Sequence, residues 1–218
     1  MTSLIESMKR DAMRNRRSHW EGVYATKAEN ALSWYQRHSS QSLAYVTAAA
    51  SWASPIIDVG GGASTLVDDL LERGYADLTV LDIAATGLAK AKVRLGQQAS
   101  RVNWIVADIR RWHPPRLYEV WHDRAVFHFL TTADDQDAYI SALQAGTRPG
   151  AWVIMATFAP DGPEKCSGLP VQRYSSRGLA SRLGAPFILM DEAVETHNTP
   201  SGNEQRFCYT ILRRDLTT

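Results

Sequence analysis

Apolar runs alternate with mixed polar stretches along most of the chain, and this alternation predicts strands separated by helices. From the first strand onward the predicted order is strand 56–60, helix 64–73, strand 77–82, helix 85–99, strand 102–108, strand 118–123, helix 134–146 and strand 151–158. A helix at 176–183 leads to two closing strands near 187–195 and 205–213. Two helices, 3–17 and 42–52, precede the first strand. The repeated order predicts an α/β fold built on a mostly parallel sheet.

Turn-forming residues mark several element ends. Gly74 and Gly146 are expected to end helices, and Ser18 to cap a short segment after the first helix. The turn Arg148-Pro149-Gly150 is expected to lead into the strand at 151–158, and 198–202 (Asn-Thr-Pro-Ser-Gly) to join the closing strands.

Residues 55–82 contain the most informative pattern in the chain. An apolar pair precedes Asp58, and three consecutive glycines follow at 60–62, where the absence of a Cβ permits a tight turn and close approach of a ligand. Asp82 comes 24 positions after Asp58, at the tip of the next predicted strand. A carboxylate at that point accepts hydrogen bonds from ribose hydroxyls in nucleotide-binding sheets. The segment therefore predicts a pocket for an adenosine-bearing cofactor.

The glycine spacing separates two candidate cofactors. A dinucleotide fingerprint needs G-x-G-x-x-G, but its third glycine position holds Thr65. In a dinucleotide site Asp58 would be poorly placed, because it would lie beside two phosphates. In an S-adenosylmethionine site it can face the ammonium group of the cofactor. The pattern D-x-G-x-G, formed by Asp58, Gly60 and Gly62, therefore favours S-adenosylmethionine. A dinucleotide, or a structural glycine turn without a ligand, are the alternatives.

Two later segments extend this pattern. The predicted strand at 102–108 ends in Asp108 followed by Ile109, and Glu119 to His128 reads as a fourth strand with its loop. With these acids at successive strand ends, the chain resembles the class I S-adenosylmethionine-dependent methyltransferases. The resemblance implies a Rossmann-like, seven-stranded, mostly parallel sheet with helices on both faces and the last strand antiparallel. It also implies S-adenosylhomocysteine as product, Asp82 at the ribose, and Asp108 with Ile109 at the adenine.

The flanking segments are similar to a narrower branch, the thiopurine and tellurite-resistance methyltransferases. The likeness is carried by 20–24 (Trp-Glu-Gly-Val-Tyr), 33–36 (Ser-Trp-Tyr-Gln), 158–170 and 196–202. It implies a helical, aromatic-rich cap at 1–54, a methyltransferase domain at 55–218, and a small-molecule acceptor, with a thiol or chalcogen favoured. A protein (lysine) methyltransferase and a non-catalytic S-adenosylmethionine-binding protein are the alternatives. The chain lacks the Asn/Asp-Pro-Pro-Tyr/Phe loop of amide and exocyclic-amine methyltransferases, which argues against those acceptors.

Site residues follow from the motifs and the resemblance. The expected cofactor-binding residues are Trp20, Tyr24, Trp34, Asp58, Gly60, Gly61, Gly62, Asp82, Ile83, Asp108, Ile109, Asp123 and Arg124. Tyr35, His128 and Cys166 are expected at the substrate. An alcohol or phenol would need a base, for which His128 with Asp123 is the expected catalytic pair, although a histidine there can equally be structural. Arg124 is expected to pair with Asp123 or with the carboxylate of the cofactor.

Composition excludes several other classes. The 218 residues are 44% hydrophobic with a net charge of +1, so no global field attracts nucleic acid or an anionic membrane. Two cysteines make neither a disulfide framework nor a metal set, and no metal is expected. Residues 1–10 lack a secretory apolar core, and the basic residues from Lys9 to Arg17 are read as a solvated helix face. The sequence predicts a cytoplasmic monomer or homodimer.

Overall fold

The computed structural model describes residues 15–216. Its first helix covers 15–26 of these residues; the predicted residues 3–14 and the expected absence of a secretory leader lie outside the described range. The predicted helix end at residue 17 and the predicted cap at Ser18 are both wrong, because Ser18 lies inside this helix. The helix continues because Trp20, Val23 and Tyr24, at i, i+3 and i+4, pack in one apolar cluster with residues of the domain.

The main sheet has seven strands, in the order β3-β2-β1-β4-β5-β9-β8. The strands are β1 (Ile56–Val59), β2 (Leu78–Asp82), β3 (Val102–Val106), β4 (Tyr118–Arg124), β5 (Thr147–Phe158), β8 (Phe187–Asn198) and β9 (Glu204–Arg214). Strands β1 to β5 pair in parallel, and β9 is antiparallel to both β5 and β8. The predicted Rossmann-like sheet, with its antiparallel last strand, is confirmed.

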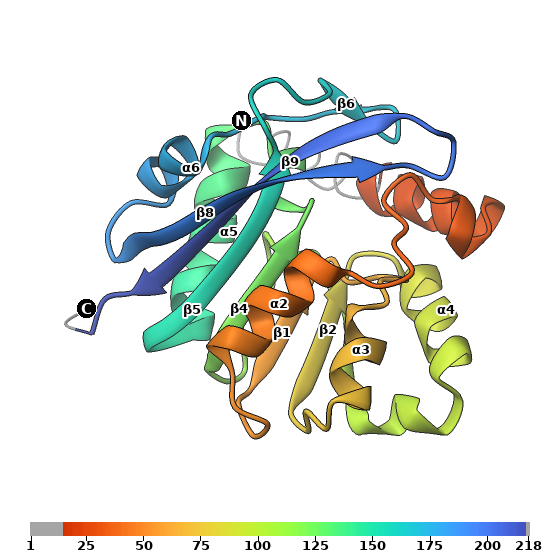
Figure 1. The fold of residues 1–218 in the computed structure, drawn as a ribbon, viewed down its shortest axis with the longest axis horizontal. Coiled ribbons are helices and arrows are strands. Elements are labelled where there is room, and N and C mark those ends of the chain that lie inside the picture. Colours follow the sequence, from red (N-terminus) through yellow and green to blue (C-terminus); the bar gives the residue numbers. More distant parts are fainter. Residues whose placement is uncertain (1–14, 217–218) are drawn as a thin grey trace, which may run out of the picture.

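Helices cover both faces of this sheet (Figure 1). The helices are α2 (Ser40–Ala49), α3 (Leu66–Glu72), α4 (Ala85–Leu95), α5 (Ala133–Gly146) and α6 (Ser176–Leu183), and the 3₁₀ turns are η1 (Glu29–Ala31), η2 (Gly96–Arg101) and η3 (Phe127–Phe129). In Figure 1, α2 and α3 lie in front of the sheet and α5 behind it. Helix α2 contacts β4 and β5, so it is one of the layers that bury the sheet.

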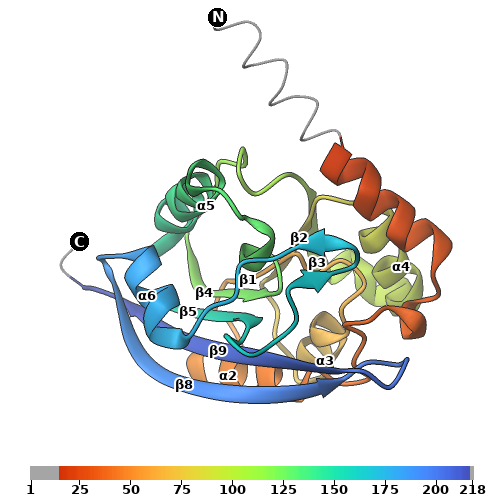
Figure 2. The same cartoon turned by 90° about the horizontal axis from the view of Figure 1, so that it is seen from above.

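Several further details differ from the sequence prediction. The helix predicted at 42–52 is α2, which begins at Ser40 and ends at Ala49, because Ala50 is extended. The helix predicted at 85–99 ends at Leu95, because Gly96 adopts φ +56° and the chain continues as a 3₁₀ turn. Strand β5 begins at Thr147, so the expected turn at 148–150 is part of the strand, beside an irregularity in its pairing with β4. A short hairpin, β6 (Lys165–Cys166) with β7 (Leu169–Pro170), was not predicted. Seen from above, this hairpin lies over the ends of the central strands (Figure 2).

The core has one apolar layer on each face of the sheet. In β1, Ile56 belongs to the cluster shared with α2 and α3, whereas Ile57 belongs to the cluster shared with α5 and α6. Strands buried on both faces read as continuous apolar runs, which is why the sequence revealed them. Each such side chain stabilises the fold by about 1.5–3 kcal/mol relative to exposure. A third cluster packs Tyr24 and Leu32 onto Ala63 and Ala84, and so fixes the leading segment at the carboxyl ends of the strands.

No helix within residues 15–216 combines the length and the apolar character needed to cross a membrane.

Candidate functional site

A cavity, called the main cavity below, lies at the carboxyl ends of β1 to β4. Its lining includes residues at or just after the ends of these strands: Val59 and Gly60 for β1, Asp82 and Ile83 for β2, Asp108 and Ile109 for β3, and Arg124 and Ala125 for β4. Trp20, Tyr24 and Trp34 from the leading segment line the same cavity. Ligands of open parallel sheets bind at this edge, outside the ends of the strands. Nine of the expected cofactor-binding residues therefore line this one cavity: Trp20, Tyr24, Trp34, Gly60, Asp82, Ile83, Asp108, Ile109 and Arg124.

A smaller cavity adjoins the main one at the glycine turn. It shares Trp34, Gly60 and Arg124 with the main cavity, and adds Asp58 and Gly61. Tyr35, expected at the substrate, also lines this smaller cavity and does not line the main one.

The glycine turn is shaped by close packing. Gly60 has φ +73°, and a Cβ there would collide with the side chain of Val126. The amides of Gly60 and Gly61 donate to the carbonyl of Leu81, at 2.6 and 3.3 Å, so both are used within the fold. A dinucleotide site presents such amides to pyrophosphate, so this geometry disfavours a dinucleotide.

Gly62 lies against the leading segment. Its φ is +45°, and the hydroxyl of Tyr24 occupies the space that a Cβ would need. Gly62 lines neither cavity; it gives Tyr24 room to pack on the turn. The structure thus gives Gly62 a packing role, and the cofactor contact expected at Gly62 stays a prediction.

Asp58 retains one free carboxylate oxygen. The side chain is buried, and its Oδ1 lies 2.7 Å from His122 Nδ1, whose Nε2 lies 2.9 Å from Ser42 Oγ. Its Oδ2 has no hydrogen-bond partner among the described residues. A buried, unpaired carboxylate oxygen is costly, so a donor is expected beside it. An ammonium group in the smaller cavity fits this oxygen.

Asp82 is the acid at the end of β2 and faces the main cavity. Its Oδ1 accepts a hydrogen bond from the Ala84 amide at 2.7 Å. Burial, helped by the negative charges of Asp58 and Glu21, raises the pKa of Asp82 to about 7. Hydroxyl groups that donate to the carboxylate would replace its lost hydration and favour the ionised form. The site therefore suits a ribose diol.

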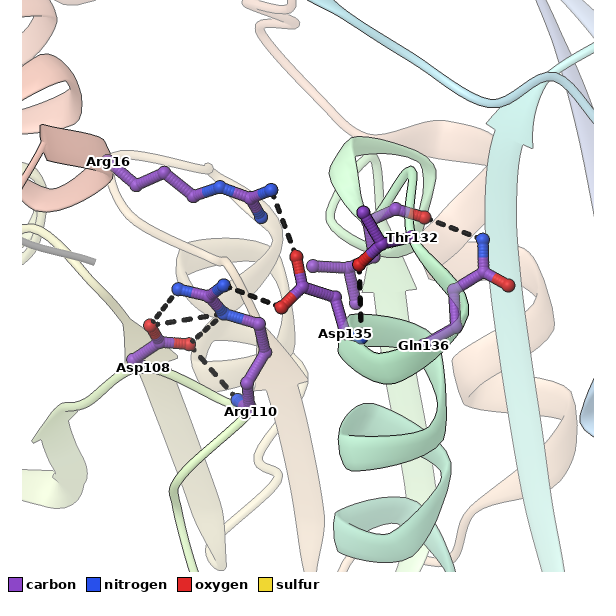
Figure 3. Close-up of polar contacts among 7 residues, drawn as sticks. Arg16, Asp108, Arg110, Thr132, Asp135 and Gln136 are labelled. Carbon is purple, nitrogen blue, oxygen red and sulfur yellow. Dashed lines mark hydrogen bonds and ion pairs between the residues drawn. The ribbon is translucent and has the colours of Figure 1, made fainter. Parts of the chain in front are cut away.

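Asp108 belongs to a chain of ion pairs that sequence reasoning missed. Arg110 donates to both of its oxygens, from Nε to Oδ1 at 2.9 Å and from Nη2 to Oδ2 at 2.6 Å. Arg110 Nη1 and Arg16 Nη2 then bind the two oxygens of Asp135, at 2.7 and 3.0 Å (Figure 3). Burial opposes the charge of Asp108, but the hydrogen bonds and charge of Arg110 outweigh it, and the pKa of Asp108 lies below its usual range. Arg17 is exposed as expected, whereas Arg16 joins the leading helix to this chain.

Asp135 lies in the first turn of α5, and its backbone amide donates a hydrogen bond to Oγ1 of the capping residue Thr132 at 3.3 Å. The ion pairs therefore connect the leading helix, the end of β3 and the start of α5 at one side of the main cavity (Figure 3). Of the expected basic residues, Lys9, Arg10 and Arg14 lie outside the described residues.

The other end of the main cavity is apolar and aromatic. Its lining there consists of Trp34, Phe129, Cys166, Leu169, Pro170, Gln205 and Phe207. Cys166, expected at the substrate, comes from the β6–β7 hairpin and is buried, and burial raises the pKa of its thiol. The thiol is therefore neutral near pH 7, and it acts as a small apolar wall residue.

Arg124 stands between the two cavities. Its guanidinium carbon lies 4.2 Å from the centroid of the Phe207 ring, and Nη2 reaches Glu195 Oε2 at 3.4 Å. The expected partner Asp123 is not the one observed: Arg124 pairs with Glu195 across the sheet.

The expected catalytic histidine, His128, is a core residue. It is fully buried between Phe129 and Phe158, with ring centroids 4.5 and 4.7 Å away, and its Nδ1 accepts a hydrogen bond from the Phe158 amide at 3.3 Å. Burial, with a smaller contribution from the charge of Arg124, lowers its pKa to about 3. His128 lines neither cavity, so the structure corrects its predicted role at the substrate to a neutral packing role.

Asp123 is likewise structural. It is fully buried and accepts hydrogen bonds from the Val126 amide at 2.8 Å, the Phe127 amide at 3.2 Å and the Tyr139 hydroxyl at 2.6 Å. These bonds hold the turn after β4, in which Ala125 adopts φ +73°. That conformation costs a non-glycine residue about 1–3 kcal/mol. Asp123 therefore shapes the wall of the main cavity without lining it, in place of the predicted catalytic and cofactor contacts.

No cluster of three or more His, Cys, Asp or Glu side chains that could hold a metal ion occurs in the described part of the chain, residues 15–216.

Comparison with known proteins agrees with this geometry. The family described as "Methyltransferase domain" matches residues 56–150, from β1 into β5. A malonyl-[acyl-carrier protein] O-methyltransferase of Anoxybacillus flavithermus is 28% identical over 157 residues, which cover 69% of this chain and 57% of that protein. The chain spans about half the length of the curated relatives it matches.

Solved structures show the same fold at low sequence identity. One comes from a study of the conversion of a disulfide bond into a thioacetal group during echinomycin biosynthesis; its TM-score is 0.74 at 18% identity, covering 93% of this chain and 94% of that one. Another is the 1,6-didemethyltoxoflavin-N1-methyltransferase of Burkholderia thailandensis, with S-adenosylhomocysteine bound; its TM-score is 0.68 at 17% identity, covering 99% and 91%. Residues 56–150 therefore match a methyltransferase domain, and the chain has the sheet order and the fold of S-adenosylmethionine-dependent methyltransferases.

Proposed function

We propose that the protein transfers a methyl group from S-adenosylmethionine to a small-molecule acceptor, with a thiol or chalcogen compound as the favoured class. The observation that carries this proposal is the continuity of the main cavity. It runs from the acids at the ends of β2 and β3 to an aromatic end formed by Trp34, Phe129 and Phe207. One cavity can therefore hold a nucleoside and an acceptor side by side.

Each acid has a binding role in this proposal. Asp82 accepts hydrogen bonds from the ribose hydroxyls, and Asp58 Oδ2 accepts one from the ammonium group. Asp108 and Ile109 bind the adenine, as the order of the strand ends supports. The cofactor supplies an electrophilic methyl group, and the aromatic faces of Trp20 and Trp34 favour its cationic centre by about 0.5–2 kcal/mol each.

The chemistry of the lining supports an acceptor that is already nucleophilic. Among the described residues that line the main cavity there is no histidine, and the only thiol, Cys166, is kept neutral by burial. A thiol is partly ionised near neutral pH, and a selenol more fully, so neither needs a positioned base. The chain then contributes by excluding water and orienting the acceptor, and orientation alone can lower a barrier by about 7–11 kcal/mol. The relatives are named for methylation at oxygen and nitrogen, so the choice of sulfur rests on the cavity chemistry.

Four other expectations stay predictions: the likeness to the thiopurine and tellurite-resistance branch, the division at residue 54, the cytoplasmic location, and the monomeric or dimeric state. The aromatic leading segment beside the cavity supports the first of them.

The test combines cofactor binding with a search for the acceptor. Calorimetry of Asp82→Ala should show a tenfold or greater rise in the Kd for S-adenosylmethionine, because a hydrogen bond to a charged group contributes about 1.5–3 kcal/mol. Asp161→Ala, which removes an exposed acid paired with Arg206, is the matched control. An unchanged affinity in Asp82→Ala would remove Asp82 from the site.

The acceptor search uses methyl-labelled S-adenosylmethionine with thiols, selenite, tellurite, phenols and amines, beside a cell lysate. Label in a small product supports the proposal. Label on a protein band would indicate a protein methyltransferase, and label nowhere, with the cofactor bound, would indicate a binding protein.

A further inference from the structure

Gln205 places an unsatisfied polar atom at the acceptor end of the main cavity. The residue lies on β9 and is only 8% exposed, and it belongs to the cavity lining. Its Oε1 is buried and has no hydrogen-bond partner among the described residues. Buried polar atoms in native proteins nearly always have a partner, so the atom that satisfies this oxygen is expected to come from a bound molecule.

The neighbouring polar side chains make hydrogen bonds to other groups. Arg124 Nη2 reaches Glu195 Oε2, and Nη1 reaches the carbonyl of Trp34 at 3.5 Å. His197, the cross-strand partner of Gln205, has its Nε2 at 2.8 Å from the carbonyl of Ser33. None of these bonds reaches Gln205, and the Nε atom of Arg124, like Oε1 of Gln205, is buried without a hydrogen-bond partner among the described residues.

The surroundings of Gln205 define the shape of what binds there. Phe207 lies two residues further along β9, on the same face of the strand, and lines the cavity with Gln205. Trp34, Phe129 and Leu169 form other parts of this end. Aromatic and aliphatic walls with one polar atom among them suit a flat, largely apolar molecule held in register by one hydrogen bond.

We propose that Gln205 is a specificity-determining residue for the methyl acceptor: it accepts a hydrogen bond from an N–H or O–H on the edge of a planar organic molecule. This inference rests on the proposed function and narrows its substrate class. A thiol acceptor would carry its sulfur on such a planar body, because an inorganic oxyanion leaves the aromatic walls unfilled. A molecule of the same shape without the donor leaves Oε1 unpaired, and is expected to bind about tenfold or more weakly.

The experiment compares probes of matched shape by calorimetry, with the protein saturated with S-adenosylhomocysteine and again without it. Indole is compared with indene, and phenol with toluene; each first member has a donor and each second member lacks it. Wild-type protein should bind the donor probes tenfold or more tightly. Gln205→Met, of similar size without an acceptor oxygen, should lose this preference, and Gln205→Glu, which keeps one, should retain it. Gln97→Met, at an exposed glutamine of η2, is the matched control and should behave as wild type.

The outcomes separate this inference from the proposed function. Equal binding of donor and non-donor probes, no binding of any probe, or a preference that survives in Gln205→Met would each overturn the inference. A preference that depends on Gln205 in a protein that does not bind S-adenosylhomocysteine would support the site and refute the proposed function instead. Unchanged thermal unfolding of Gln205→Met excludes misfolding as the cause of its loss.

Discussion

The burial of Asp82 predicts a pH dependence of cofactor binding. In the free protein the pKa of Asp82 is raised to about 7, so the carboxyl is about half protonated at neutral pH. Ribose hydroxyls donate to the ionised form, and binding therefore favours loss of the proton. The sign follows: affinity is greatest above pH 7 and falls as the pH falls through the raised pKa.

The size of the effect follows from the titration of one group. If only the ionised form binds, the fraction of protein with an ionised Asp82 falls about tenfold between pH 8 and pH 6, which corresponds to about 1.4 kcal/mol. Asp82→Asn has a similar shape and no titration in this range, and should weaken binding at pH 8. The Kd ratio of Asp82→Asn to wild type should therefore shrink about tenfold from pH 8 to pH 6.

Calorimetry with S-adenosylhomocysteine at four or five pH values measures this ratio. The ratio cancels the titration of the ligand and of every other group that the two proteins share. A ratio that stays constant from pH 6 to pH 8 would show that Asp82 does not exchange a proton on binding, and would refute the reasoning from its burial.

Three further predictions concern residues around the cavity. Tyr139→Phe removes the hydroxyl that donates to the buried Asp123, and should lower the free energy of unfolding by about 1–3 kcal/mol in denaturant titrations; an unchanged midpoint would contradict the role of this bond. Asp135→Asn weakens the ion pairs of the leading helix and should speed dissociation of the cofactor in stopped-flow experiments, whereas Asp137→Asn, at a more exposed pair, should not; equal rates in the two variants would argue against the connection. His128→Asn should keep the pH profile of methyl transfer, because the neutral histidine lies outside the cavity lining; loss of an inflection present in wild type would restore it as a base.

The arrangement of the sheet could be predicted because its information is local. Apolar runs such as Ile56-Ile57 identify strands buried on both faces, and glycines such as Gly74 end the helices between them. Parallel strands present their carboxyl ends at one edge, so Asp58, Asp82 and Asp108 were expected together, and the structure places them at the two adjoining cavities. Composition and spacing were therefore enough to predict the strands and the edge at which the acids lie, without any knowledge of side-chain direction.

The functions of Asp123 and His128 depended on direction, which the linear pattern does not contain. Both residues are at or after the end of β4, as the sequence indicated, yet both point into the core. Arg110, Asp135 and Gln205 were missed by the sequence analysis, because only the folded chain brings them to the cavity.

Each of these three residues is an ordinary polar residue in the sequence. Arg110 and Asp135 are 25 positions apart and meet only because the loop after β3 and the first turn of α5 come together beside the main cavity, and Gln205 reaches the cavity from the far end of the chain. The sequence by itself therefore determined the fold and the cofactor edge, through hydrophobic period and glycine conformation. The tertiary structure decided which polar atoms are paired, which are buried without a partner and which face the acceptor, because these properties arise from contacts between distant segments.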